Sequence, residues 1–318
     1  MEGDPQPLVS VLVPTFNRRD YLKETLASVL RQSFGDFEVI VSDNASEVDP
    51  ADVVAGFADP RLRYYRNPSN LGVTGNLLAA CGHARGKYVA VLGDDDLWDP
   101  QFLATLVAPL ESDPSLALAF CDHFIIGPDG RPDPAESDRV SRRWQRHRLH
   151  QGIYRPFQEI ALVYRSICVF SGSLLRRSAI DWQSIPRDLD FSVDVYLGYL
   201  AARTGLGCYY VPRRLSYYRY HAGSLGSSLK RTEQRLANAR DATVYWDRFL
   251  QDAALGNKSY FEMKRGFNAA VVALTLLQSS GVRPALEELR RSWKAGLLRP
   301  RILLYHLLYA LRLHRANA

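Results

Sequence analysis

The ten residues VLGDDDLWDP, at positions 91–100, form an apolar run that stops abruptly at three consecutive carboxylates, Asp94, Asp95 and Asp96. Adjacent carboxylates repel. Because removing an ion from water costs several kcal/mol, a buried strand that ends here needs a cation or strong hydrogen bonds beside it. Oxygen ligands favour hard ions such as Mg²⁺ or Mn²⁺, whose open positions are completed by water and substrate phosphates. The alternative is a solvated acidic turn in which Asp96 caps a helix over residues 99–111.

Strand and helix patterns alternate on the N-terminal side of this stretch. Short apolar runs rich in β-branched residues predict strands over residues 8–13, 37–42, 62–66 and 87–92. Apolar residues at helical spacing predict helices between them, over residues 21–30, 51–58 and 72–84. Such alternation favours βαβ units and a mostly parallel sheet covered on both faces, whose ligands bind beyond the carboxyl ends of the strands. Thr15, Asp43 and Asp94 all follow strand ends, so we expect them to share one edge of the sheet.

The chain beyond residue 100 carries fewer signals. A strand is expected over residues 115–126, and the polar, basic stretch 131–152 lacks sustained periodicity. We expect that stretch to be a surface loop, either a lid over the substrates or, as we favour, an ordinary insertion. Apolar periodicity predicts helices over residues 157–164, 189–205, 229–255, 260–278, 284–295 and 301–314.

Composition limits the class of protein. The 318 residues are 47% hydrophobic and 23% charged, with a formal net charge of +6, so the chain can bury a full core and its basic excess is modest. Its four cysteines are far apart and form no CxxC pair, which favours reduced thiols in a cytoplasmic protein over disulfides or a zinc site. No N-terminal leader is apparent, and no run approaches the roughly 20 apolar residues of a membrane-spanning helix.

The last predicted helix, residues 301–314, is apolar with basic borders. At 1.5 Å per residue it is about 20 Å long, too short to span a bilayer. It suits either the cytosolic surface of a membrane or packing on the rest of the chain or on a partner subunit, including a second copy in a homo-oligomer. We expect no nucleic-acid partner.

The nucleotide-binding motifs that are missing from the sequence exclude two classes of enzyme. No GxGxxG follows the first strand and there is no GxxxxGK, which argues against dinucleotide dehydrogenases and P-loop enzymes. The order VSVLVPTFNR, then VIVSDNAS, then NLGVTGNLLAACGHARGKYVAVLGDDDLWDP resembles the N-terminal half of family 2 glycosyltransferases, and the resemblance continues through residues 191–227. It implies the GT-A fold, a Rossmann-like, mixed but mostly parallel sheet flanked by helices. The catalytic domain would occupy residues 1–228, with nucleotide-sugar binding in 1–126, acceptor binding in 153–228 and a helical extension in 229–318.

The resemblance also implies roles for individual residues. On the donor side, Asp94 and Asp95 would approach the ribose and the diphosphate, and Asp96 would ligate a divalent metal, Mn²⁺ or Mg²⁺, that bridges the two phosphates. The residues that would otherwise contact the nucleotide or its phosphates are Pro14, Thr15, Asn17, Asp43, Asn44, Asn76, Arg219 and Ser224, with Asp43 on the base. His221, in a YRxH match, would be a second metal ligand or a phosphate contact. Members of the family often carry an arginine where this chain has Gly75, so contacts made by that arginine are in question here.

Asp194 would be the catalytic base of such an enzyme. The resemblance places an acidic residue at the start of the 189–205 helix, where it takes a proton from the acceptor hydroxyl. An ordinary Asp, with a pKa of about 3.9, is a weak base towards an alcohol, so Asp194 should be partly desolvated or deprotonation should lag behind bond formation. Without the resemblance, Asp194 would only complement the helix dipole, and Pro14, Thr15, Asp43 and Asn44 would only form turns.

The resemblance therefore implies an inverting, metal-dependent hexosyltransferase that uses a nucleoside-diphosphate sugar, with uridine or thymidine donors preferred. Its acceptor would belong to glycan, glycolipid or glycoconjugate biosynthesis. One alternative is a non-catalytic binding or scaffold protein with the same fold. A less favoured one is a sugar nucleotidyltransferase, which would need a glycine-rich basic loop that is missing after the first strand.

Overall fold

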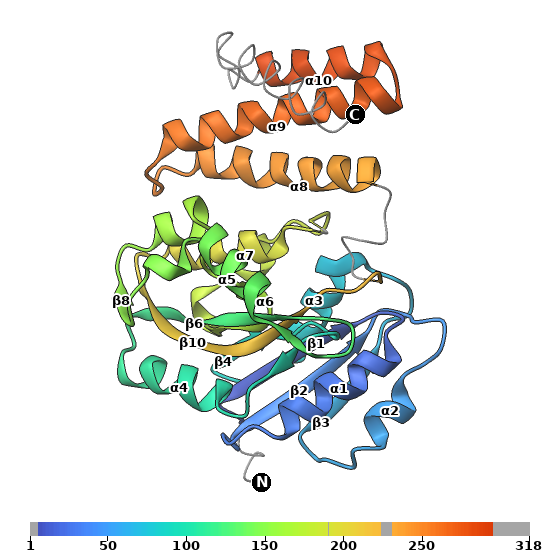
Figure 1. Ribbon diagram of the computed structural model, residues 1–318, viewed down its shortest axis with the longest axis vertical. Coiled ribbons are helices and arrows are strands. Elements are labelled where there is room, and N and C mark those ends of the chain that lie inside the picture. The colour runs from blue at the N-terminus through green and yellow to red at the C-terminus, as the bar shows by residue number, and fades with distance from the viewer. Residues whose placement is uncertain (1–5, 190, 224–230, 295–318) are drawn as a thin grey trace. The chain divides into compact units, whose positions relative to one another are not determined.

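The computed structural model describes residues 6–189, 191–223 and 231–294. Contacts divide the chain into two compact units, Met1–His221 and Ala222–Ala318. The first unit is built on a ten-stranded sheet with helices around it, and the described part of the second unit is helical (Figure 1).

Four parallel strands form the N-terminal half of the sheet. They are β1 (Val9–Thr15), β2 (Phe37–Asp43), β3 (Leu62–Arg66) and β4 (Tyr88–Val91), in the order β3-β2-β1-β4. Most side chains of β1, β2 and β4 are buried on both faces of the sheet, which explains why these strands read as continuous apolar runs. The helices α1 (Arg19–Leu30), α2 (Ala51–Ala55) and α3 (Gly72–Gly82) connect them as the sequence predicts.

The second half of the sheet is mixed. The short strand β9 (Ser173–Arg176) runs antiparallel to both of its neighbours, β4 and β6 (Leu116–Ile126). The last strand, β10 (Gly207–Arg219), is parallel to β6 and antiparallel to β5 (Leu97–Trp98). The pairing of β5 with β10 brings the end of β10 beside the acidic triplet, although more than 100 residues separate them in the sequence. Between β5 and β6, helix α4 runs over Phe102–Ser112, so its N-cap is Gln101 and not Asp96.

The stretch 131–152 is not the surface loop that its composition predicts. It forms β7 (Pro132–Asp133), α5 (Pro134–Arg143), the 3₁₀ turn η1 (Arg146–Arg148) and the start of β8 (Gly152–Tyr154). Asp133 caps α5 by accepting a hydrogen bond from the Glu136 amide at 2.9 Å, with a proline at the first helical position. The Arg146 side chain is buried, and its Nε donates to Asp122 Oδ1 at 2.7 Å. Because that contact joins residues 24 apart, no local pattern reveals it.

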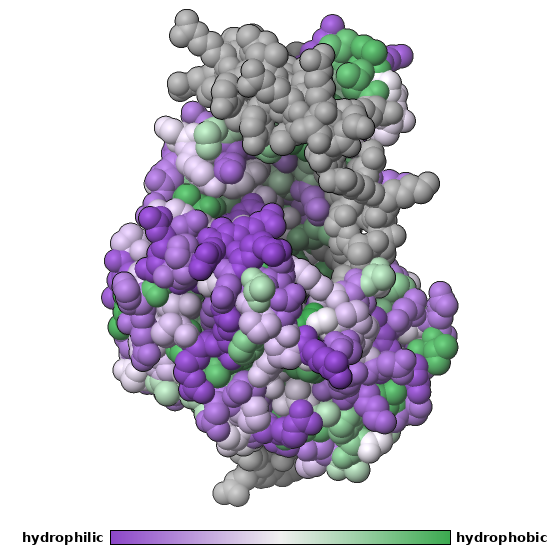
Figure 2. All heavy atoms as spheres, viewed as in Figure 1, coloured by the Kyte–Doolittle hydropathy of each residue, from purple (hydrophilic) through white to green (hydrophobic). Residues whose placement is uncertain are grey.

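Further short elements complete the first unit. They are the π-helical turn η2 (Glu159–Val163), α6 (Val169–Gly172), the 3₁₀ turns η3 (Arg177–Ala179) and η4 (Trp182–Ser184), and helix α7 (Val193–Ala202). On the face shown in Figure 2, hydrophobic residues of this unit are scattered among hydrophilic ones, which is normal for a protein surface.

The second unit contains α8 (Arg231–Gln251), α9 (Lys258–Ser279) and α10 (Val282–Lys294), near the positions expected from periodicity. Aromatic side chains pack between α8 and α9, with the rings of Phe249 and Phe261 5.5 Å apart. The Lys258 ammonium group donates to the carbonyls of Phe249 and Leu250, which ends α8 favourably. No helix among the described residues is long and apolar enough to span a membrane. The predicted 301–314 helix lies outside the described residues.

Candidate functional site

The carboxyl ends of β1, β2 and β4 meet at one edge of the sheet. Thr15 on β1 is paired in register with Asp43 on β2, and the Asn44 amide donates to the Thr15 carbonyl at 2.9 Å. The next residue after Thr15, Phe16, donates its amide to Asp94 Oδ2 at 3.2 Å. The expectation that Thr15, Asp43 and Asp94 share one edge is therefore confirmed.

Asp96 lies at the bottom of this site. Its side chain is buried, and its two carboxylate oxygens accept hydrogen bonds from different partners. Oδ1 accepts from the Arg219 amide at 2.9 Å, and Oδ2 accepts from the Ser171 hydroxyl at 2.5 Å. Burial, reinforced by the neighbouring charge of Asp95, raises the pKa of Asp96 well above its usual range. We call Asp96, Ser171 and Arg219 the floor of the site.

Arg219 contributes its side chain as well as its amide to the floor. Its guanidinium is fully buried: Nε donates to the Asp95 carbonyl at 2.7 Å, and Nη1 to the Pro128 carbonyl at 2.9 Å. Nη2 donates to Glu24 Oε2 at 2.7 Å. These three partners hold its guanidinium inside the protein, and a contact between Arg219 and the diphosphate stays a prediction.

A second group lies above the floor and is more open to solvent. Arg18 Nη1 is 2.8 Å from Asp94 Oδ1 and also 2.8 Å from Asp95 Oδ2. The same Asp95 oxygen is 2.9 Å from His221 Nε2, and the His221 ring packs against Tyr21 with 4.6 Å between ring centroids. We call Arg18, Asp95 and His221 the rim. Asp95 is thus a carboxylate beside His221, and the assignment of Asp96 and His221 as metal ligands stays a prediction.

The donors of the rim fit a divalent metal only in part. The described residues contain no group of three or more His, Cys, Asp or Glu side chains that could enclose a metal ion. Asp95 and His221 nevertheless offer a carboxylate and an imidazole side by side, and Mn²⁺ accepts both kinds of ligand. Two protein ligands suit an ion whose remaining positions are completed by substrate phosphates and water. The donor set therefore fits a metal that is shared with a phosphate ligand.

Gly93 keeps the space between the two carboxylates open. A Cβ atom at this position would lie 3.0 Å from Asp96 Oδ2 and 3.1 Å from Asp95 Oδ1. Those distances are tighter than ordinary contacts, so a side chain would press on both groups. The Gly93 amide also donates to the Ser171 hydroxyl at 3.1 Å, which fixes the strand end above the floor.

The predicted base contact, Asp43, is fully buried. Its carboxylate accepts hydrogen bonds from the Ser46 amide and hydroxyl, and Arg66 Nη1 lies 2.8 Å from Oδ2. Asn76 is also buried, and its amide nitrogen donates to the Ser42 carbonyl at 3.0 Å. In this structure both side chains therefore hold strand ends together, and Arg66 stands between Asp43 and the surface.

Asn44 and Asn17 support the loops around this edge. Asn44 Oδ1 accepts the Leu71 amide at 2.9 Å, which fixes the start of α3. Asn17 adopts a left-handed conformation with φ of 56°, and its Oδ1 accepts the Glu47 amide at 2.8 Å. Pro14 and Thr15 occupy the last two positions of β1, and Thr15 is buried. Ser224 lies outside the described residues.

Gly75 explains why no arginine precedes Asn76 here. A Cβ at Gly75 would lie 2.7 Å from the Leu71 Cβ, closer than real side chains approach. A larger residue at this position would push the start of α3 away from the strand ends. The contacts that an arginine could make there are therefore absent for a steric reason.

Asp194 lies in the first turn of α7 and is half-buried. Burial raises the pKa of its carboxyl above the usual range, against the opposing effects of the Val195 amide and the Arg165 charge. No side chain of the described residues donates a hydrogen bond to this carboxylate. Desolvation by burial and the negative charges of Asp96, Asp95 and Asp194 raise the pKa of Tyr218, so Tyr218 lies within electrostatic reach of these three carboxylates.

Three residues of the site were missed by sequence reasoning. Arg18 follows the PTFN segment directly and is one of a pair of arginines, which was the one available signal. Arg66 was assigned only to a strand. The bond of Ser171 to Asp96 joins residues 75 apart, and the left-handed φ of 62° at Ser171 cannot be read from sequence.

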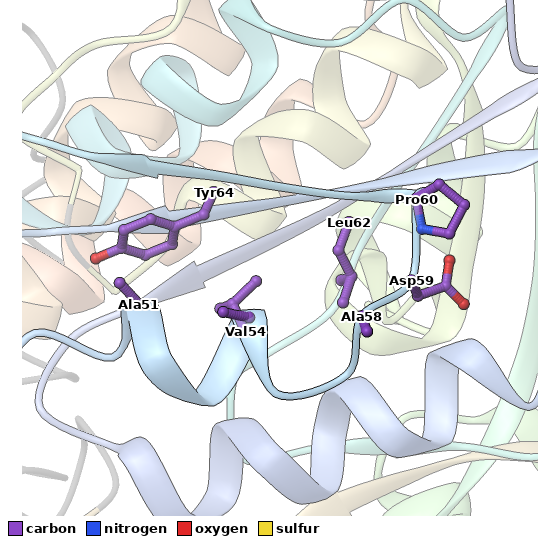
Figure 3. A pocket seen from close by; sticks show the side chains of 8 residues that line it. Ala51, Val54, Ala58, Asp59, Pro60, Leu62 and Tyr64 are labelled. Carbon is purple, nitrogen blue, oxygen red and sulfur yellow. The ribbon is translucent and has the colours of Figure 1, made fainter.

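A separate recess of about 500 Å³ lies between α2 and β3. In Figure 3, Ala51 and Val54 of α2 stand opposite Leu62 and Tyr64 of β3. None of the floor or rim residues lines it. The recess is open and mainly apolar, and it plays no part in the site at the strand ends.

Comparisons with known proteins bear on the family and the fold of this chain. A family model described as "Glycosyl transferase family 2" matches residues 10–181. The putative teichuronic acid biosynthesis glycosyltransferase TuaG of Bacillus subtilis is 33% identical over 129 residues, which cover 40% of this chain and 51% of TuaG. The alignment therefore spans about half the length of this curated relative.

Two solved structures resemble this one over most of its length. TarS residues 1–349 of S. aureus, in complex with UDP-GlcNAc, has a TM-score of 0.63 at 16% identity and covers 86% of this chain and 74% of TarS. The mannosyltransferase PcManGT of Pyrobaculum calidifontis, in complex with GDP-Man and Mn²⁺, has a TM-score of 0.59 at 19% identity. Its coverage is 96% of this chain and 86% of PcManGT. At these identities the likeness establishes the fold.

Proposed function

The chain belongs to glycosyl transferase family 2 and has the GT-A fold, and from that premise we propose that it transfers a sugar from a nucleoside-diphosphate sugar to an acceptor hydroxyl with inversion. One observation carries the proposal. A carboxylate–imidazole pair, Asp95 and His221, lies beyond the end of β4, and a desolvated carboxylate, Asp194, lies in the first turn of α7. Tyr218 is in electrostatic reach of both carboxylates. A site of this kind can neutralise negative charge on a leaving group with one set of residues and accept a proton from an attacking hydroxyl with another.

The leaving group is a nucleoside diphosphate, on which negative charge grows as the glycosidic bond breaks. Asp95 and His221 are the residues that would hold a divalent metal, Mn²⁺ or Mg²⁺. When bound, such an ion would neutralise charge on the diphosphate more strongly in the transition state than in the ground state. The floor keeps Asp95 in place, because Arg219 Nε donates to its main-chain carbonyl.

The acceptor hydroxyl must lose a proton as it attacks the sugar. Asp194 is the proposed general base: burial raises the pKa of its carboxyl, which makes it a better proton acceptor than an exposed aspartate. The negative charge of Asp194 also stabilises the positive charge that develops on the sugar ring in the transition state. A single carboxylate opposite the leaving group supports one displacement, and hence inversion at the anomeric carbon.

The related proteins suggest a class of donor and a class of acceptor for this chain. TarS was solved with UDP-GlcNAc and PcManGT with GDP-Man, so we propose a UDP-, dTDP- or GDP-linked hexose as donor. The name of TuaG supports an acceptor in glycan, glycolipid or glycoconjugate biosynthesis. We further propose that the protein works at the cytosolic face of the membrane, with residues 301–314 as the basic and apolar segment that would contact it.

The proposal is tested by a thermal-shift panel of UDP-, dTDP- and GDP-sugars, each with and without Mn²⁺. A ligand that binds only the folded state raises the melting temperature, so selective stabilisation by one donor with Mn²⁺ is the expected result. The selected donor is then assayed for release of nucleoside diphosphate, and the product anomer is read by NMR. Absence of stabilisation by every donor, or a product with retained configuration, would contradict the proposal. Release of pyrophosphate would instead indicate a nucleotidyltransferase.

A further inference from the structure

Arg18 occupies an unusual place in the site. One nitrogen of its guanidinium bridges Asp94 Oδ1 and Asp95 Oδ2, at 2.8 Å from each. Its side chain is 22% exposed, more than those of Asp94 at 6% and Asp95 at 14%. Arg18 therefore covers both carboxylates from the solvent side, in contrast to the buried Arg219.

The position of Arg18 conflicts with metal binding. Asp95 Oδ2 is the oxygen that both Arg18 and His221 contact. A divalent cation held by Asp95 and His221 would have to share the Asp95 carboxylate with the Arg18 guanidinium. Two positive charges bound to one carboxylate repel each other. A metal and Arg18 therefore compete for the same negative charge.

The loop that carries Arg18 is anchored on its other side. The Asn17 amide donates to the Ser46 hydroxyl at 2.8 Å, and the Asn17 side-chain Oδ1 accepts the Glu47 amide at 2.8 Å. The main chain around Arg18 is thus fixed independently of the rim. The long side chain of Arg18 can leave Asp95 without disturbing those main-chain contacts.

We propose that Arg18 is a displaceable counter-ion, which excludes free divalent metal from the rim and releases Asp95 when the metal arrives together with a nucleoside diphosphate. The proposal rests on the proposed function, because it needs a site that takes a metal–diphosphate pair. It explains how three adjacent carboxylates stay together before the donor binds. It also makes metal and nucleotide binding cooperative, since each assists the other by the same free energy.

Direct binding of Mn²⁺ without any nucleotide tests the idea. The free Mn²⁺ signal in electron paramagnetic resonance is titrated with the wild type and with Arg18→Gln. Arg18→Gln removes the competing charge, so its dissociation constant for Mn²⁺ is expected to be about tenfold lower than that of the wild type. A purely structural role, or a role as a direct support of the metal site, predicts the opposite direction. Equal or weaker Mn²⁺ binding by Arg18→Gln overturns the proposal.

Two matched variants separate charge from position. Arg19→Gln removes the same charge one residue away, where it pairs with the 68%-exposed Asp52, and should leave Mn²⁺ affinity unchanged. Arg18→Lys keeps the charge and should bind Mn²⁺ as the wild type does, within about twofold. Tightening by Arg19→Gln or by Arg18→Lys to the level of Arg18→Gln also overturns the proposal. Arg18→Ala provides a second neutral variant should melting curves show that Arg18→Gln is unfolded.

This experiment separates the two proposals. It uses Mn²⁺ alone, so its outcome does not depend on whether any sugar donor is turned over. If no donor is bound or cleaved but Arg18→Gln binds Mn²⁺ more tightly, the proposed function and the release of Asp95 by a metal–diphosphate pair fail, and only the exclusion of free metal by Arg18 stands. If donors are cleaved and Arg18→Gln shows no gain, only the counter-ion role fails.

Discussion

The floor and the rim use the same kinds of side chain for opposite purposes. In the floor, both oxygens of the buried Asp96 and three nitrogens of the buried Arg219 guanidinium are committed to protein partners. In the rim, Asp95 meets Arg18 and His221 at a solvent-facing edge. A buried and fully satisfied carboxylate stabilises the fold, whereas a carboxylate with partners that can move remains available to a ligand.

The comparison shows why adjacent residues differ. Residues 93–96 form a turn between β4 and β5, in which the Asp96 amide donates to the Gly93 carbonyl at 3.1 Å, so the side chains of Asp95 and Asp96 leave the main chain in different directions. Asp96 points towards β10 and Ser171, and Asp95 points towards the open edge. Variants of the floor should therefore alter stability, and variants of the groups that face ligand should alter activity.

The largest expected effect is on activity and comes from Asp194. Asp194→Asn removes the proposed base while keeping size and shape, so transfer to the acceptor should fall about 10³-fold, within the usual range for general bases. The measurement is kcat for release of nucleoside diphosphate in the presence of acceptor. Donor binding in the thermal-shift assay should persist. Retention of more than a tenth of the wild-type rate would remove Asp194 from the mechanism.

The largest expected effect on stability comes from Arg219. Arg219→Gln removes a fully buried guanidinium, breaks its ion pair with the half-exposed Glu24 and takes the donor from the carbonyls of Asp95 and Pro128, so unfolding should become easier by about 3 kcal/mol, roughly 1 kcal/mol for each lost hydrogen bond. Urea denaturation measures this change. Arg283→Gln is the control, because Arg283 is 92% exposed and pairs with Glu287 on one face of α10. The control should change stability by less than about 0.5 kcal/mol.

A substitution of Asp95 should reduce activity and leave stability almost unchanged. Asp95→Asn keeps the shape of the side chain but removes the charge that faces His221, so kcat/KM should fall about 100-fold, equivalent to about 2.7 kcal/mol. The free energy of unfolding should change by less than about 1 kcal/mol. Asp52→Asn, on an exposed carboxylate outside the site, should leave both quantities unchanged. A large loss of stability in Asp95→Asn would place Asp95 in the floor.

A substitution of Ser171 should reduce stability less than a substitution of Arg219. Ser171→Ala leaves Asp96 Oδ2 and the Gly93 amide without their partner, which should cost about 1–3 kcal/mol of stability. Urea denaturation beside Ser112→Ala, whose hydroxyl is exposed, isolates the effect of burial. Equal stability of the two variants would show that water replaces the Ser171 hydroxyl.

The smallest expected effect is a pH dependence of stability at Asp194. Because its folded pKa is raised above the unfolded value, the folded state binds this proton more tightly, and the wild type loses stability as the pH rises through the raised pKa. Asp194→Asn has no such loss. Its melting temperature should match that of the wild type near pH 4 and exceed it by about 2 °C at pH 7, since the side chain is only half-buried. A difference that is constant across this range would mean that the pKa is not raised.

Much of the fold was predictable because it depends on local patterns. The parallel strands of the N-terminal half read as apolar β-branched runs, and the helices between them show regular spacing. The convergence of Thr15, Asp43 and Asp94 followed from topology alone, since parallel strands end at one edge. The antiparallel insertion of β9 and the helix α5 depended on distant partners and were not foreseen.

Sequence alone thus determined the family, the type of sheet and the edge where the chemistry gathers, because composition and periodicity record which residues must be buried. Tertiary structure decided how the acidic triplet is divided, with Asp96 tied to Arg219 and Asp95 set beside Arg18 and His221. The reason is that hydrogen bonds between residues 75 to 126 positions apart are set by strand pairing and burial. Neither leaves a signature in the ten residues that carry the carboxylates.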